Sequence, residues 1–176
     1  LGDVYKRQDI GSNSEWIRER VGIKNRRTVL PLDYIKTTKN VDTRAAMEAA
    51  QYTNAQTGVL AAKMALERAG LQPKDIGLVI SSSCIPDLSC PSEASTVAAG
   101  LDIEALSFDL NSACSSFGVA LNFIDNMKPA ALPAYVLLLN VENMTKVINY
   151  SDRNTAALWG DGATAAIVSA SVASKI

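Results

Sequence analysis

The residue best placed for nucleophilic chemistry in this chain is Cys114. A strand-like segment at residues 108–111 ends just before it, and an apolar helical pattern over residues 114–127 begins at it. A thiol at a helix N-terminus meets unpaired backbone N–H groups and the positive end of the helix dipole, which lower its pKa from roughly 8.5. The thiolate is the form that attacks carbonyl carbon. The residues around it are small and leave space for a substrate: Ser112, Ala113, Ser115, Ser116 and Gly118. The alternative is a small buried hydrophobic side chain, the commoner role of a single cysteine.

Several other kinds of chemistry are excluded within these 176 residues. The chain contains no histidine, so it can form neither a Ser/His nor a Cys/His catalytic pair. Cys84 and Cys90 lie six residues apart with no further ligands nearby, and we therefore predict no metal site. Three cysteines do not make a disulfide framework.

Composition and charge narrow the function classes further. Seventeen Lys and Arg against eighteen Asp and Glu give a net charge of −1, which argues against nucleic acid as a partner. No apolar run is long enough for a transmembrane helix, so no membrane association is predicted. Without a secretory leader, a cytoplasmic protein is expected. Residues 1–8 show no periodicity, and we interpret them as a non-native leader.

The elements that must position Cys114 alternate along the chain. Helices are predicted from residue 13 to Gly22, over 43–69, over 91–99 and over 114–127; strands are predicted over 76–80, 107–110, 135–139 and 163–169. Residues 30–42 read as a loop. The second half of the 43–69 helix is apolar nearly all round and is expected to be buried between layers. In the 114–127 helix, Phe117, Leu121 and Ile124 form one apolar stripe. This alternation indicates a layered α/β domain with a mostly parallel sheet.

The Gly160-Asp161-Gly162 segment resembles a phosphate-binding loop at first sight. It does not lie between a strand and a following helix, as such a loop should. We therefore predict a tight structural turn near the active site.

Short motifs along the chain resemble the β-ketoacyl-acyl-carrier-protein synthase III family. The segment SEWI at residues 14–17, followed by Arg20 and by VGI at 21–23, is similar to an N-terminal motif of that family. The later landmarks follow in the same order: ALERAGL at 65–71, CPS at 90–92, NSACSSF at 111–117, DRNT at 152–155 and GDGA at 160–163. Each motif is weak alone, but together they span residues 12–171.

The resemblance implies the thiolase fold, in which two similar α/β halves share a buried central helix layer. Residues 9–176 would then be an incomplete N-terminal thiolase-like domain. It would have a layered α/β/α half-fold and lack the first strand and the C-terminal half. Residues 28–56 are longer than the family pattern, with a charged insert of unexplained role.

The resemblance also implies a function and its site residues. Cys114 would take an acyl group from acyl-CoA, and malonyl on acyl carrier protein would then decarboxylate and attack the thioester. This reaction starts fatty-acid or polyketide synthesis. Trp16 and Arg153 would hold the CoA adenine between them, and Arg20 would lie near its phosphates. No cofactor is implied, because acyl-CoA is a substrate, and the complete protein would be a homodimer.

Three alternatives remain open. The chain could belong to a secondary-metabolite acyltransferase or to another thiolase-superfamily enzyme that uses the same cysteine, or it could be a non-catalytic interaction domain. The family also calls for a histidine and an asparagine from its second half. We therefore expect the 176-residue chain to be inactive alone.

Overall fold

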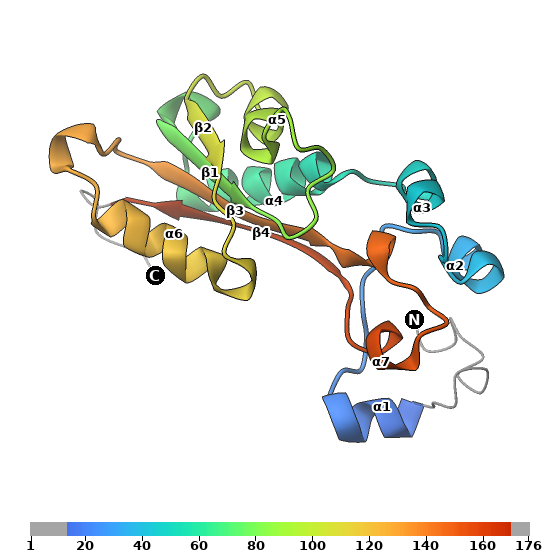
Figure 1. Ribbon diagram of the computed structural model, residues 1–176. Coiled ribbons are helices and arrows are strands. Elements are labelled where there is room, and N and C mark those ends of the chain that lie inside the picture. The colour runs from blue at the N-terminus through green and yellow to red at the C-terminus, as the bar shows by residue number, and fades with distance from the viewer. Residues whose placement is uncertain (1–13, 170–176) are drawn as a thin grey trace. The chain divides into compact units, whose positions relative to one another are not determined.

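The computed structural model describes residues 14–169, which form two compact units (Figure 1). The sheet unit comprises residues 54–142 and 163–169, and the helical unit comprises residues 14–53 and 143–162. The predicted leader at residues 1–8 and the predicted domain start at residue 9 lie outside the described residues.

The sheet unit is built on a four-stranded sheet with the order β2-β1-β3-β4. Its strands are β1 (Leu78–Ser82), β2 (Leu106–Asp109), β3 (Val136–Asn143) and β4 (Asp161–Val168). Strand β1 is parallel to both of its neighbours, with Leu78 opposite Leu106 on one side and Val136 on the other. Strand β4 runs in the opposite direction to β3 (Figure 1). The prediction of a mostly parallel sheet is therefore confirmed.

Helices cover both faces of this sheet. Helices α4 (Asn54–Ala69) and α5 (Glu93–Ala99) lie on one face, and α6 (Ser116–Asp125) lies on the other (Figure 1). Three short 3₁₀ helices complete the connections: η2 (Pro73–Asp75), η3 (Ala113–Ser115) and η4 (Pro129–Ala131). The unit therefore has the layered α/β/α arrangement that the sequence predicts.

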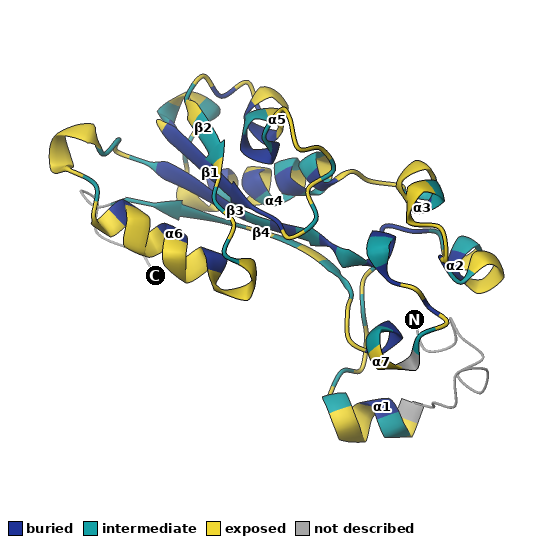
Figure 2. Cartoon of the chain, in the orientation of Figure 1, coloured by how far each residue is buried: buried dark blue, intermediate teal, exposed yellow. Residues whose placement is uncertain are grey.

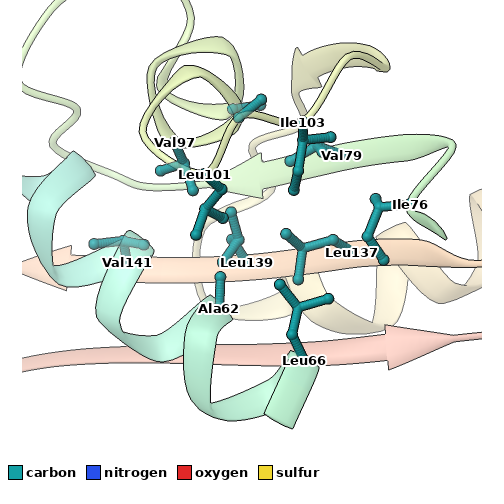
Figure 3. Close-up of a cluster of buried hydrophobic side chains, with 12 residues drawn as sticks. Ala62, Leu66, Ile76, Val79, Val97, Leu101, Ile103, Leu137, Leu139 and Val141 are labelled. Atoms are coloured by element: carbon teal, nitrogen blue, oxygen red, sulfur yellow. The ribbon is translucent and has the colours of Figure 1, made fainter. Parts of the chain in front are cut away.

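Alternate side chains of the central strands supply the core on each face. Val79, Leu137 and Leu139 pack against α4 and α5, in the cluster drawn in Figure 3. Leu78 and Ile80 instead pack against Ala120 and Ile124 of α6, which is why β1 is buried along its whole length. Close packing on the first face also requires a glycine in α4. A Cβ atom at Gly58 would lie 2.9 Å from a methyl group of Val97 in α5.

The predicted helix over residues 43–69 is interrupted in the structure. Helix α3 (Thr43–Ala49) ends before Ala50, whose backbone is extended, and α4 begins at Asn54. Contacts with the loop after β1 hold this break: the Asn54 backbone N–H donates to Asp87 Oδ2 (2.5 Å), and its side chain donates to Ser83 Oγ (3.2 Å). The expected all-round burial of the second half is also wrong for the described residues, because Leu60 and Met64 are exposed.

Helix α6 is covered along a different stripe from the predicted one. Ser116, Ala120 and Ile124, spaced by four residues, are buried, while Phe117 and Leu121 are exposed. Figure 2 shows α6 as mostly exposed, with separate buried patches along it. Residues spaced by four lie on one face of a helix, so this face packs against the strands and Phe117 and Leu121 point away from them.

The helical unit joins two distant segments of the chain. It contains α1 (Ser14–Val21), α2 (Leu32–Thr38), α3, η5 (Met144–Val147) and α7 (Arg153–Ala156). The prediction of a loop over residues 30–42 is wrong in part, because α2 lies within this stretch. Pro31 immediately precedes the helix, and Ile35 is buried in the core of the helical unit. The Asn40 amide donates to the carbonyls of Thr145 (3.1 Å), Lys146 (3.1 Å) and Ile148 (3.0 Å), which joins the two segments.

The predicted turn at residues 160–162 is wrong. Asp161 and Gly162 are the first residues of β4. The Asp161 carboxylate accepts hydrogen bonds from the backbone N–H groups of Val29 (2.6 Å) and Thr145 (2.7 Å). The motif therefore begins a strand and uses its carboxylate to bind two other segments of the helical unit.

Candidate active site

Cys114 lies between a strand and a helix, as the sequence predicts. It is the central residue of η3, the short helix that follows β2 and leads directly into α6. The residue is exposed. The thiol is therefore accessible at the N-terminal end of the helix, at the edge of the sheet where the parallel strands β1, β2 and β3 end. A small buried hydrophobic role does not fit this exposure.

The residue before Cys114 has an unusual backbone conformation. Ala113 has a φ of 48°, in the left-handed region that residues other than glycine rarely adopt. Its N–H donates to Oδ1 of Asn111 (2.9 Å), which closes a short turn after β2. The chain thus reverses within a few residues of the strand end and presents Cys114 at the start of the helix.

Serine hydroxyls hold the turn that carries the thiol. The Ser115 hydroxyl donates to the carbonyl oxygen of Ser112 (2.7 Å). The Ser116 hydroxyl accepts from the Ser112 N–H and donates to the Ala113 carbonyl oxygen, both of which precede Cys114. From the sequence, these serines are predicted only to be small neighbours of the thiol. Their clustering at a helix start was the available signal, since serine there commonly bonds nearby backbone.

A second thiol lies in electrostatic range of Cys114. Cys84 follows the end of β1, and its backbone N–H donates to Oε1 of Glu142 in β3 (2.7 Å). Burial raises the pKa of the Cys84 thiol, and its hydrogen bond with Glu142 and the nearby Cys114 raise it further. This grouping cannot be predicted from the sequence, because three different strand ends contribute to it.

A buried glutamate lies beneath the same sheet edge. Glu93, the first residue of α5, is only 5% exposed, and its Oε1 accepts a hydrogen bond from Ser81 Oγ (3.1 Å). Its Oε2 has no hydrogen-bond partner among the described residues. Burial raises the pKa of this carboxyl, and the charges of Asp109 and Asp87 add to the effect, although hydrogen bonds from Asn54 and Ser81 oppose it. The surroundings of Glu93 therefore shift its equilibrium toward the neutral acid, compared with an exposed glutamate.

The predicted CoA-binding residues lie in the helical unit, whereas Cys114 lies in the sheet unit. Trp16 is half-buried in α1, and Arg20 is exposed one turn later on the same face of that helix. Arg153 is the first residue of α7. The structure therefore brings Trp16 and Arg20 together on one helix.

The part of the chain that the structure describes contains no cluster of three or more potential metal ligands among its Cys, Asp and Glu side chains. Within residues 14–169, no helix has the length and apolar character needed to cross a membrane.

Comparison with known proteins gives consistent matches. The family described as 3-oxoacyl-[acyl-carrier-protein (ACP)] synthase III matches residues 108–176. The β-ketoacyl-[acyl-carrier-protein] synthase III of Rhizorhabdus wittichii is 33% identical over 162 residues, covering 92% of this chain and 45% of that protein. The protein of the same name from Sphingopyxis alaskensis is 34% identical over 162 residues, covering 92% of this chain and 44% of that protein.

Solved structures resemble this fold closely. The 3-oxoacyl-[acyl-carrier-protein] synthase III of Aquifex aeolicus gives a TM-score of 0.77 at 31% identity, covering 94% of this chain and 48% of that one. The priming β-ketosynthase of a polyketide biosynthetic pathway gives a TM-score of 0.76 at 33% identity, covering 92% of this chain and 43% of that one. The chain spans less than half the length of each of these four proteins. In sequence and in its layered α/β/α fold, the chain is therefore similar to about half of a β-ketoacyl-acyl-carrier-protein synthase III.

Proposed function

We propose that this chain carries the nucleophile of a condensing acyltransferase, and that the nucleophile is Cys114. The observation that supports the proposal is the exposed thiol at the start of α6, held in a turn inside the segment that matches the family. The Cys114 thiolate would attack the carbonyl carbon of an acyl-CoA. The CoA thiolate would leave and take up a proton, and the acyl group would remain on Cys114 as a thioester.

The second step would use malonyl on acyl carrier protein. Loss of carbon dioxide would leave an enolate, whose carbon attacks the thioester and releases the Cys114 thiolate. The backbone N–H of Cys114, at the N-terminal end of the helical segment, would help to stabilise the negative charge on the carbonyl oxygen. The product would be a β-ketoacyl group on the carrier protein, the first intermediate of fatty-acid or polyketide synthesis.

Acylation of Cys114 is the direct test. Incubation of the complete protein with a short acyl-CoA should add one acyl mass to the peptide that contains Cys114, and Cys114→Ala should abolish the adduct. Cys90 provides an internal control, because it is an exposed cysteine outside the helix start. An adduct that survives Cys114→Ala, or that forms on Cys84 or Cys90 instead, would show that the assignment is wrong. No adduct at all would favour the non-catalytic interaction domain.

The 176-residue chain alone should not carry out the condensation. The family resemblance calls for a histidine to stabilise the enolate, and these 176 residues contain none. The complete protein, assayed with malonyl carrier protein and with other acyl acceptors, would separate a fatty-acid enzyme from a secondary-metabolite acyltransferase. The 33% identity to a polyketide priming synthase is the reason to include polyketide-type acceptors.

We also propose that Trp16, Arg20 and Arg153 bind the CoA part of the substrate. Flat aromatic and guanidinium groups suit adenine, and an arginine fork suits phosphate. In the complete protein, Trp16→Ala and Arg153→Ala should raise KM for acyl-CoA by an amount equivalent to about 1–3 kcal/mol. Alkylation of Cys114 by a small reagent should be unchanged.

Arg18→Ala is the matched control, because Arg18 is an exposed arginine on another face of α1. An equal rise in KM for this control, or an unchanged KM for both Trp16→Ala and Arg153→Ala, would contradict the assignment.

A further inference from the structure

The hydroxyl of Ser116 bonds to two peptide groups on the N-terminal side of Cys114. Ser116 is the first residue of α6 and is 2% exposed. Its Oγ accepts a hydrogen bond from the backbone N–H of Ser112 (2.8 Å) and donates one to the carbonyl oxygen of Ala113 (2.7 Å). One buried hydroxyl therefore joins the helix to the turn that precedes the thiol.

The residue that this hydroxyl holds is the one with the unfavourable backbone. Ala113 is left-handed, with a φ of 48°, and such a conformation persists only where surrounding groups impose it. Two side chains hold its peptide groups. Asn111 Oδ1 accepts from its N–H (2.9 Å), and the Ser116 hydroxyl donates to its carbonyl. Of these two side chains, only that of Ser116 is buried, so water cannot readily replace its contact.

We propose that Ser116 is a positioning residue for Cys114. Its hydroxyl keeps Ala113 left-handed, and this backbone conformation keeps the Cys114 thiol presented to solvent at the start of α6. The inference deepens the proposed function, because it rests on Cys114 being the nucleophile. It requires no contact between Ser116 and a substrate.

The first test measures alkylation of Cys114 by iodoacetamide, followed by peptide mass spectrometry over a range of pH. In the 176-residue chain, Ser116→Ala should slow alkylation of Cys114 about five-fold or more, because the net loss of one hydrogen bond corresponds to a ratio of about five and the hydroxyl makes two. The rate at Cys90 should stay constant. Ser115→Ala is the matched control. It also removes a hydroxyl from this turn, but an exposed one whose bond water can replace, so the rate should change less than about two-fold.

The second test asks whether Ser116 acts through the backbone of Ala113. Glycine adopts positive φ without steric cost, so Ala113→Gly should make the hydroxyl largely unnecessary. The double variant Ala113→Gly with Ser116→Ala should therefore react at Cys114 within about two-fold of Ala113→Gly alone. If Ser116→Ala alone does not fold, this comparison in the Ala113→Gly background decides the question.

Two results would overturn the proposal. The first is an unchanged alkylation rate of Cys114 in Ser116→Ala. The second is that Ser116→Ala slows alkylation as much in the Ala113→Gly background as it does in the wild type. Iodoacetamide alkylation needs no acyl-CoA. A chain in which Ser116 affects alkylation but Cys114 accepts no acyl group would refute the proposed function and leave the positioning role intact.

Discussion

Replacing Glu93 by glutamine should change how stability depends on pH. The Glu93 carboxyl is 5% exposed and accepts a bond from Ser81, and its second oxygen has no partner among the described residues. Burial raises its pKa in the folded chain, whereas in the unfolded chain it titrates near the ordinary glutamate value of about 4.3. Between these two pKa values the folded state holds a proton that the unfolded state has lost.

The sign and size of the effect follow from this difference in bound protons. The contribution of Glu93 to stability is fully present below the unfolded pKa and is lost as pH rises through the raised folded pKa. The steepest loss for one proton is about 1.4 kcal/mol per pH unit. Glutamine cannot ionise and so removes this loss. Its buried amide adds a pH-independent destabilisation of about 1–3 kcal/mol.

Urea unfolding followed by circular dichroism between pH 4 and pH 8 would measure the effect. The free energy of unfolding of Glu93→Gln, relative to the wild type, should rise with pH across the titration of Glu93. Glu104→Gln is the matched control, because Glu104 is an exposed glutamate in the same unit. Parallel curves for Glu93→Gln and the wild type would refute the reasoning. A relative stability that falls with pH would show that Glu93 is ionised and favourably paired.

Three further predictions concern the two units. Asp161→Asn should speed amide hydrogen exchange at Val29 and Thr145 about ten-fold or more, because a charged acceptor is lost from two backbone donors; unchanged exchange would contradict the joining role of Asp161. Leu137→Ala should lower the free energy of unfolding by about 2–5 kcal/mol, since this side chain is fully buried between β3 and the α4/α5 layer; a loss below about 1 kcal/mol in urea titration would show that the core is not packed as described. The exposed apolar face of α6 should bind a hydrophobic dye, and Phe117→Ser should weaken the fluorescence enhancement; an unchanged signal would place the dye elsewhere.

Features set by local pattern were predictable from the sequence. The apolar run before residue 81 indicated a strand covered on two faces, and β1 is buried throughout. The change from strand to helix periodicity around Cys114 placed the thiol at a helix start, where the structure has it. The spacing of apolar residues is set within a short window of the chain, so a single sequence is enough to predict these elements.

Features set by distant contacts were not predictable. The break before α4 depends on Asp87, which lies 33 residues beyond Asn54. The role of Asp161 depends on Val29, which lies 132 residues earlier. Local propensity favours one continuous helix in the first case and a glycine-rich turn in the second, and tertiary contacts override both.

The two-segment helical unit also determines when this part of the protein can fold during synthesis. Asn40 bonds to the carbonyl of Thr145, which is 105 residues later. At roughly 5–20 residues per second, a ribosome needs about 5 to 20 seconds to make the intervening chain. Until then, Leu30 and Ile35 lack the buried partners Ile148 and Tyr150 that cover them in the finished unit. Slow codons between residues 54 and 142 should therefore lengthen the time during which these side chains remain uncovered on the nascent chain.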